Sequence, residues 1–231
     1  MNYAVIVAGG TGSRMGADRP KQFLKLKGRT ILQRTLAPFL ACEDIHQIWV
    51  GTHPDWLSFT QNLVQQMNCQ KPVYVVAGGG TRTDTMFLTI QQKQQQYPNL
   101  DDIVVTHDAV RPFITPTIIT NSIIVAKKYK SCSIATPAVD TIARHQQNYI
   151  EQILPRQELC HIQTPQTFQE GELLRCFHQL TPQQKSQLTD ACGVVMAAGG
   201  KVALIPGDRQ NIKITTPFDM LVANAILNQE E

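Results

Sequence analysis

Short runs of β-branched and apolar residues alternate along the chain with longer stretches of helical periodicity. The short runs predict strands at 3–8, 47–52, 73–77, 103–107, 133–136 and 202–205. The longer stretches predict helices near 30–41, 54–67, 82–96 and 116–128, and a closing helix that begins at Pro217 behind Thr216 as its N-cap. The run Ile-Val-Val at 103–105 is apolar without alternation, as in strands buried on both faces. This order predicts an α/β fold: a mostly parallel sheet with helices on both faces.

The stretch 139–154 interrupts this order, because two runs of mixed polar and apolar residues flank a polar turn. Such a pattern predicts a β-hairpin. A two-stranded ribbon is only marginally stable alone, so we expect it to lie against the body of the protein or against a second subunit. We therefore predict one domain over residues 1–231, with 139–155 as a β-hairpin arm, and a homodimer.

The composition is that of an ordinary globular protein, with 231 residues, of which 42% are hydrophobic and 17% charged. A net charge of +3, from 21 Lys and Arg against 18 Asp and Glu, is too balanced for the broad basic surface that binds nucleic acid. The first apolar run stops at Gly9, too early for a signal peptide or a membrane span. We expect a cytoplasmic protein without nucleic-acid or membrane partners. Its six cysteines are scattered without CxxC spacing, and we assign them no chemistry.

Three loops follow predicted strands, at the edge of the sheet where α/β proteins bind ligands: 9–22, 78–85 and 108–113. The first is rich in glycines, which present backbone N–H groups to phosphate oxygens without obstruction by Cβ. It lacks the Gly-Lys-Ser/Thr of a Walker A loop, and its GxGxxxG spacing departs from the dinucleotide fingerprint. Either Arg14 or Lys21 alone would be interpreted as a surface charge. Together with the glycines, the two cations favour a site for a triphosphate.

The other two loops add a helix N-terminus and a carboxylate. In 78–85, Thr81 or Thr83 would cap the next helix, whose free N–H groups attract anions, although a plain strand-to-helix turn explains the loop equally well. Asp108 suits Mg²⁺, which is usually held by one or two carboxylates together with substrate phosphates. An Asp that caps the following turn is the alternative. His107 faces the other side of the strand and is predicted to pack rather than to react.

Two further cations remain undecided from the residues alone. Lys213 interrupts an otherwise apolar alternation, and Arg156 follows the predicted hairpin. A surface position explains each of them as well as a site does.

A set of motifs, taken in chain order, resembles the cytidylyltransferases that make CDP-activated polyol phosphates: AGGTGSRMG, RPKQF, GGGTRTDT, THDAVRPF, PAVDT, QTPQTF, LTDAC and NIKITTP. The resemblance runs from about residue 4 to the final helix and implies a Rossmann-like fold. It also implies a reaction in which a polyol phosphate attacks the α-phosphorus of CTP and pyrophosphate leaves, with Mg²⁺ as cofactor. An ionised phosphate needs no general base, which agrees with the lack of a Ser/His/Asp or Cys/His arrangement. The reaction does need preorganised cations.

The resemblance further implies roles for single residues. The catalytic cations would be Arg14, Lys21 and Lys213, and Asp108 would hold the metal. The CTP-binding residues would be Val7, Ala8, Gly9, Gly10, Gly80, Thr81, Arg82, Thr83, Asp84, Thr85, Met86 and Arg111. The polyol phosphate would be held by Thr141, Arg156, Thr164 and Lys213. In this family the hairpin arm crosses a homodimer and brings the equivalents of Thr141 and Arg156 into the partner's site.

Two branches of the family differ in the acceptor. THDAVRPF, LTDAC and the NIKITTPFDMLVANAI segment favour the ribitol-5-phosphate branch over the methylerythritol-4-phosphate branch, which usually has an acidic residue at the position of Ala191. Gly80 stands where relatives often have an acidic residue, and His161-Ile162 where they have an aromatic residue or Gly. A non-catalytic nucleotide-binding module is the alternative from another class, and the cation set argues against it. A dinucleotide oxidoreductase is disfavoured by the glycine spacing.

Overall fold

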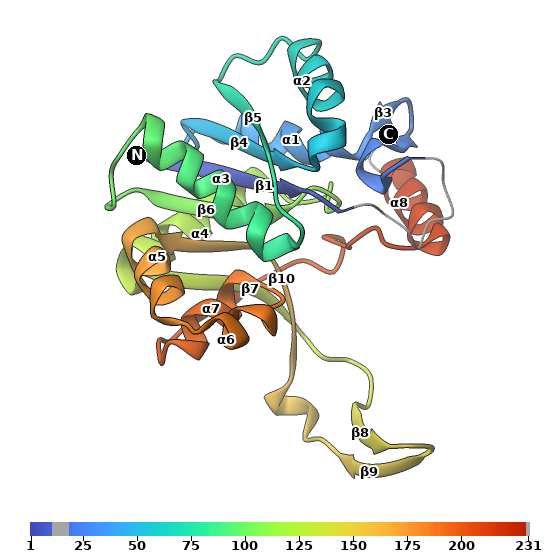
Figure 1. The fold of residues 1–231 in the computed structure, drawn as a ribbon. Coiled ribbons are helices and arrows are strands. Elements are labelled where there is room, and N and C mark those ends of the chain that lie inside the picture. The colour runs from blue at the N-terminus through green and yellow to red at the C-terminus, as the bar shows by residue number, and fades with distance from the viewer. Residues whose placement is uncertain (11–18, 230–231) are drawn as a thin grey trace.

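The computed structural model describes residues 1–10 and 19–229, and its main sheet has seven strands in the order β11-β7-β10-β6-β1-β4-β5 (Figure 1). These strands are β1 (Asn2–Ala8), β4 (Gln47–Thr52), β5 (Val73–Ala77), β6 (Ile103–Asp108), β7 (Ser131–Pro137), β10 (Cys160–Gln169) and β11 (Ala203–Pro206). Neighbouring strands run parallel except β10, which is antiparallel to both β6 and β7. The predicted mostly parallel sheet is confirmed.

Strand β10 is the element that the hydrophobic pattern did not predict. Its sequence is largely polar and contains Pro165, which has no N–H for a ladder hydrogen bond and therefore argues against a central strand. The structure accommodates the proline because the register with β7 shifts between Ile162 and Gln166. As a result, Thr164 lies at the centre of the sheet, beside the end of β6.

Helices cover both faces of the sheet (Figure 1). They are α1 (Ile31–Ala41), α2 (Leu57–Gln65), α3 (Arg82–Gln96), α4 (Pro116–Tyr129), α5 (Glu170–Gln179), α6 (Pro182–Ser186), α7 (Ala191–Ala197) and α8 (Pro217–Gln229), with short 3-10 helices η2 (Lys21–Phe23), η3 (Pro54–Trp56) and η4 (Arg156–Glu158). All seven residues of β1 are buried. Alternate residues of this strand belong to two separate apolar clusters, one on each face, which explains why it shows no hydrophobic alternation.

The helix ends follow the predicted capping signals. Thr30 and Gln33 form a capping box at the start of α1, and Thr81 caps α3. At α8, the Thr216 hydroxyl accepts from the N–H of Asp219 at 3.3 Å, which confirms Thr216 as the N-cap before Pro217. The predicted helix over 54–67 is divided into η3 and α2.

A small hairpin of β2 (Lys25–Leu26) and β3 (Arg29–Thr30) supports the carboxyl-terminal segment. It turns at Lys27 and Gly28, whose φ angles of 43° and 79° are both positive, as in the tight turns that glycine favours. Leu26 and Ile31 pack there with Ile214, Leu227 and other apolar residues. This third apolar cluster holds the chain on both sides of Lys213.

The predicted hairpin is confirmed. Strands β8 (Ala143–Gln146) and β9 (Tyr149–Ile153) form a separate two-stranded sheet that projects from the body of the protein (Figure 1). Every residue of β9 is exposed. Across the described ranges, the helices are all too short or too polar to cross a bilayer.

A buried ionic cluster joins α3, β6 and α5 at the amino-terminal edge of the sheet. The Lys93 ammonium pairs with the carboxylates of Asp102 and Glu170, and the side chains of all three are almost fully buried. The amino group of Met1 lies 2.6 Å from Asp102. Nothing in the sequence pattern had indicated this cluster.

Candidate active site

A pocket lies beyond the carboxyl ends of β1, β4 and β6, where the chain order reverses around β1. Ligands of open α/β sheets bind at such a position. The cavity has a volume of about 380 Å³. It is lined by Val7, Ala8, Gly9, Gly10, Lys21, Gln22, His53, Gly80, Thr81, Arg82, Asp108, Ala109, Val110 and Lys213. All three loops expected from the strand order therefore contribute to one cavity.

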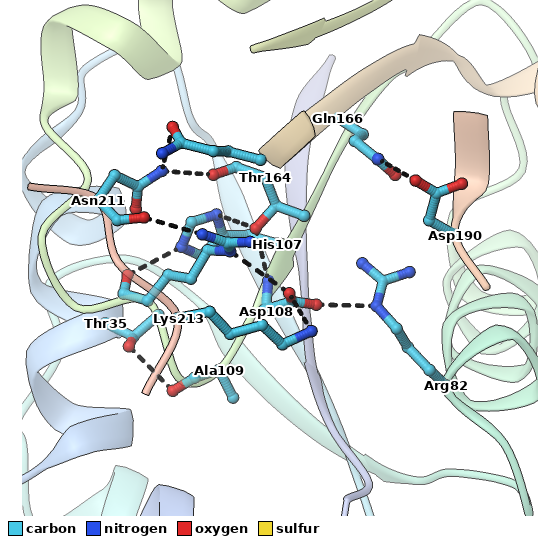
Figure 2. A network of polar contacts seen from close by, with 12 residues as sticks. Thr35, Arg82, His107, Asp108, Ala109, Thr164, Gln166, Asp190, Asn211 and Lys213 are labelled. Atoms are coloured by element: carbon cyan, nitrogen blue, oxygen red, sulfur yellow. Dashed lines mark hydrogen bonds and ion pairs between the residues drawn. The ribbon is translucent and has the colours of Figure 1, made fainter. Parts of the chain in front are cut away.

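Asp108 at the end of β6 is surrounded by cations from three different segments (Figure 2). Its Oδ1 accepts from Arg82 Nε at 2.8 Å, and its Oδ2 lies 2.9 Å from Lys213 Nζ and 3.5 Å from Arg111 Nε. Burial alone would raise the pKa of Asp108, but the charges of Arg82, Lys213 and Arg111 outweigh it and hold this pKa well below its usual range. The carboxylate is therefore ionised at neutral pH, and three cations face it.

Several donors of this cluster have no hydrogen-bond acceptor among the described residues. They are Nη1 and Nη2 of Arg82 and Nε of Arg111, and all three atoms are buried. Buried donors are normally satisfied, and an unsatisfied one is costly. Together with the excess of positive charge, these donors make the pocket suited to an anion with several oxygens, such as a polyphosphate.

His107 is the buried neighbour of Asp108 and is held as a neutral imidazole. Desolvation lowers the pKa of His107 to about 4. Its Nε2 lies 3.0 Å from the Arg111 carbonyl, which can only accept, so Nε2 carries the proton. Its Nδ1 therefore accepts from the Thr164 hydroxyl at 3.0 Å. The expectation that His107 packs agrees with this arrangement and with its ring contact to Phe39.

The start of the glycine loop, at Gly9 and Gly10, is held by Gln22, a residue that the sequence reasoning did not single out. The Gln22 amide donates to the carbonyls of Ala8 at 2.7 Å and Gly10 at 3.0 Å. Gly9 is required for packing, because a Cβ there would lie 2.6 Å from Oγ1 of Thr85. The close approach of α3 to β1 thus depends on glycine at this position.

Only the start of the 80–86 segment reaches the cavity. Gly80, Thr81 and Arg82 line it, whereas the capping box uses Asp84, whose carboxylate accepts from the Thr81 N–H at 3.1 Å. The side chains of Thr83, Thr85 and Met86 are buried in the interior of the protein instead. Met86 packs with the apolar residues of β1, Thr85 lies against the backbone at Gly9 and Gly51, and the Thr83 hydroxyl donates to the Leu188 carbonyl at 3.4 Å.

The residues predicted to hold the acceptor are not brought together in this chain. Lys213 lines the cavity, but Thr164 is buried with its hydroxyl engaged by His107. Thr141 and Arg156 are exposed at the base of the arm, and Arg156 donates to the carbonyl of Val139 at 2.9 Å. Arg14 lies outside the described residues.

His53, Ala109, Val110 and Asn211 were also missed by sequence reasoning. His53 follows β4 and lines the cavity, so the rule that ligands bind beyond strand ends would have identified it. Asn211 is fully buried, and its amide donates to the Thr164 carbonyl at 2.9 Å. No sequence signal pointed to that contact.

None of the described residues that line the cavity is a cysteine. All six cysteines are free. Burial raises the pKa of Cys132 and of Cys192 to about 12, so both thiols are protonated at neutral pH. Within residues 1–10 and 19–229, moreover, no three His, Cys, Asp or Glu side chains are grouped so as to hold a metal ion by themselves.

Comparisons with known proteins agree with this site. The sequence profile of the 2-C-methyl-D-erythritol 4-phosphate cytidylyltransferase family matches residues 2–229. A protein named ribitol-5-phosphate cytidylyltransferase from Lactiplantibacillus plantarum is 40% identical over 231 residues, covering 99% of each chain.

Solved structures of similar proteins share the fold. The 4-diphosphocytidyl-2C-methyl-D-erythritol synthase of Anaerococcus prevotii matches with a TM-score of 0.82 and 25% identity, covering 99% of this chain and 96% of that one. The 2-C-methyl-D-erythritol 4-phosphate cytidylyltransferase of Francisella tularensis matches with a TM-score of 0.82 and 28% identity, covering 97% and 98%. With a sequence and a fold that agree over nearly its whole length, this chain belongs to the 2-C-methyl-D-erythritol 4-phosphate cytidylyltransferase family.

Proposed function

We propose that this protein transfers the cytidylyl group of CTP to D-ribitol 5-phosphate, forming CDP-ribitol, a precursor for teichoic acid synthesis, and pyrophosphate. The observation that carries the proposal is the convergence of Lys21, Arg82 and Lys213 on one cavity that is also lined by Gly9 and Gly10. The choice of acceptor rests on the relative named ribitol-5-phosphate cytidylyltransferase, at 40% identity. The solved structures, named for methylerythritol phosphate, are 25% and 28% identical.

The chemistry follows from the charges in the cavity. An oxygen of the acceptor phosphate attacks the α-phosphorus of CTP, the bond from that phosphorus to the bridging oxygen breaks, and pyrophosphate leaves with the electron pair. No group has to remove a proton, because the phosphate is already ionised. Lys21, Lys213 and Arg14 would stabilise the charge that gathers on the α-phosphate and on the leaving group, while Arg82 and Arg111 would bind the outer phosphates. Of these cations, Lys21, Arg82 and Lys213 line the cavity before the substrate arrives.

Asp108 would hold a magnesium ion that arrives with the nucleotide. Both of its carboxylate oxygens are already paired with cations, Arg82 and Lys213. Asp108 by itself therefore does not form a resident metal site. The donor set fits Mg²⁺ once phosphate oxygens complete it, since this ion is commonly held by one or two carboxylates and substrate phosphates. When bound, the ion would neutralise negative charge on the phosphates.

A homodimer would complete the acceptor site. The arm exposes Tyr149, Ile150 and Ile153, whose exposed fractions are 78%, 69% and 55%. Apolar residues grouped in this way on a projecting ribbon are typical of a subunit interface. Thr141 and Arg156 at the base of the arm would then face the cavity of the partner and hold the phosphate of the acceptor.

Incubating the protein with CTP, Mg²⁺ and each acceptor, and measuring pyrophosphate release, tests the reaction. We expect release with D-ribitol 5-phosphate. If pyrophosphate is released with 2-C-methyl-D-erythritol 4-phosphate and not with D-ribitol 5-phosphate, the protein belongs to the methylerythritol-4-phosphate branch instead. Calorimetry that detects CTP binding, with turnover on neither acceptor, would support a non-catalytic nucleotide-binding module instead.

A mixing experiment tests whether the partner's arm completes the site. Lys21→Ala and Arg156→Ala should each be inactive as homodimers. In a mixed dimer, one site combines an intact Lys21 with an intact Arg156 from the partner, so exchange of subunits should restore about a quarter of the wild-type activity. Absence of recovery, or a mass near the 25.8 kDa of one chain by light scattering, would reject the shared site.

A further inference from the structure

A closed ring of hydrogen bonds joins three segments of the chain: the end of β6 with Asp108 and Arg111, the part of β10 with Thr164, and the segment that carries Lys213. We call the residues that close it, His107, Arg111, Thr164 and Asn211, the polar ring (Figure 2). His107 and Arg111 flank the end of β6, Thr164 belongs to β10, and Asn211 precedes Lys213 by two residues. The ring thus connects parts of the chain that are far apart in sequence.

Each hydrogen bond of the polar ring has a fixed direction. The Asp108 N–H donates to the Thr164 hydroxyl at 3.1 Å, which donates to His107 Nδ1 at 3.0 Å. His107 Nε2 donates to the Arg111 carbonyl at 3.0 Å, and Arg111 Nη1 donates to the Asn211 carbonyl at 2.8 Å. The Asn211 amide closes the ring by donating to the Thr164 carbonyl at 2.9 Å. Reversal of the imidazole tautomer would break the bond to the Arg111 carbonyl, which cannot donate, and would make the Thr164 hydroxyl an acceptor instead of a donor.

The ring leaves Thr164 no hydrogen to give to a substrate. A hydroxyl has one hydrogen, and this one is donated to His107. A phosphate oxygen needs a donor, so Thr164 could bind it only by breaking the ring. Thr164 is also almost fully buried, with an exposed fraction of 4%.

We infer that Thr164, His107 and Asn211 act as positioning residues, which set the distances among Asp108, Arg111 and Lys213, and that the Thr164 hydroxyl does not donate to the acceptor phosphate. Three cations crowd one carboxylate in this cluster, and their mutual repulsion would separate them if the backbone did not hold them. Preorganised charges of this kind lower the barrier only when their positions are exact to a fraction of an ångström, and a displacement of about 1 Å costs roughly 10²-fold in rate. The kinetic part of this inference rests on the proposed function.

Thr164→Val tests the inference, because it replaces the hydroxyl by a methyl group of similar size. We expect kcat to fall about 10- to 100-fold while KM for the polyol phosphate and for CTP stays within about threefold. Thr164→Ser, which keeps the hydroxyl, should restore kcat to within about threefold of wild type. Asn211→Leu opens the ring at another bond and should lower kcat in the same way.

Thr167→Val is the matched control. Thr167 lies on the same strand, is equally buried, and donates its hydroxyl to Ser122 at 2.8 Å, away from the cavity. It should lower Tm about as much as Thr164→Val but leave kcat unchanged. An equal loss of kcat in both valine variants would overturn the positioning role. A rise of tenfold or more in KM for the polyol phosphate with unchanged kcat would show instead that Thr164 contacts the substrate.

Nitrogen-15 NMR of the imidazole gives a readout that needs no turnover. The wild-type protein should show His107 as the Nε2–H tautomer at neutral pH. In Thr164→Val the nitrogen-15 shifts should indicate a mixture of the two tautomers, whereas Thr167→Val should keep the Nε2–H tautomer. A wild-type Nδ1–H tautomer would overturn the ring. A protein that shows the expected tautomers but transfers no cytidylyl group would refute the proposed function and leave the ring intact.

Discussion

His107 makes the stability of this protein depend on pH in a window that the structure defines. Burial lowers its pKa from the ordinary value of 6.5 to about 4. Between these values the unfolded chain binds a proton that the folded chain does not. The free energy of unfolding therefore rises with pH across this window and is lost as pH falls through it, with a slope of up to about 1.4 kcal/mol per pH unit from this one group.

The expected magnitude follows from the difference between the two pKa values. A difference of about 2.5 corresponds to roughly 3 kcal/mol of stability, present above pH 6.5 and lost by about pH 4. Asp108 contributes at lower pH, because its folded-state pKa lies below its usual range and its stabilisation is lost only as pH falls toward that value. Measurements between pH 4.5 and 7.5 therefore report on His107 together with the other groups that titrate there, among them Glu170, whose pKa is raised by burial.

Urea unfolding over that pH range, for the wild type and for His107→Asn, separates His107 from the other histidines. The variant is less stable at neutral pH, because Asn cannot complete the same hydrogen bonds, but its stability should depend less steeply on pH. The difference between the two proteins should shrink by about 3 kcal/mol toward low pH. Equal slopes in both proteins, or an NMR titration that places the imidazole pKa near 6.5, would refute the reasoning.

Four further predictions concern other parts of the molecule. Lys21→Ala should lower the rate of pyrophosphate release by roughly 10²- to 10³-fold, the usual cost of one charge-stabilising donor, whereas Lys25→Ala on the exposed neighbouring strand should not. Gly80→Ala should raise the free energy of unfolding by about 0.4–1 kcal/mol, because a Cβ there meets no atom within 4 Å, and denaturant unfolding that shows a loss would contradict this. Gly9→Ala should instead lower it by about 1–3 kcal/mol in the same assay, since its Cβ would lie 2.6 Å from a hydroxyl oxygen of α3. Lys93→Met removes the cation that joins two buried carboxylates, leaves Glu170 without it and leaves Asp102 only the amino group of Met1, and should lower the free energy of unfolding measured in urea by about 3–5 kcal/mol. A change below about 1 kcal/mol would mean that this lysine does not stabilise the buried cluster.

The sequence predicted the strands that are apolar and bounded by turns, because burial on both faces leaves a continuous β-branched run. The strands β4 and β5 and the helix α3 have the predicted bounds. Strand β10 was missed for the converse reason. Its polar residues are satisfied by partners such as His107 and Asp190, which are distant in sequence, so no local pattern indicates that the segment is buried.

The loops of the candidate site were predicted because the ends of parallel strands meet at one edge of the sheet. Lys21, Arg82 and Asp108 were all found in loops that follow strands, and all line the cavity. Roles that depend on which way a side chain turns were not accessible in this way. Thr85 follows the cavity residue Arg82 by only three positions on α3. The packing of α3 on β1 alone decides that Thr85 is buried.

By itself the sequence determined the alternation of strands and helices, the hairpin arm and the glycine loop, since each depends on residues that are neighbours in the chain. The tertiary structure decided which charges meet. Asp108 and Lys213 lie 2.9 Å apart although more than a hundred residues separate them, and the polar ring that holds them uses hydrogen bonds between three segments. Hydrogen bonds and ion pairs act over a few ångströms in space without regard to distance along the chain, and so only the folded protein reveals them.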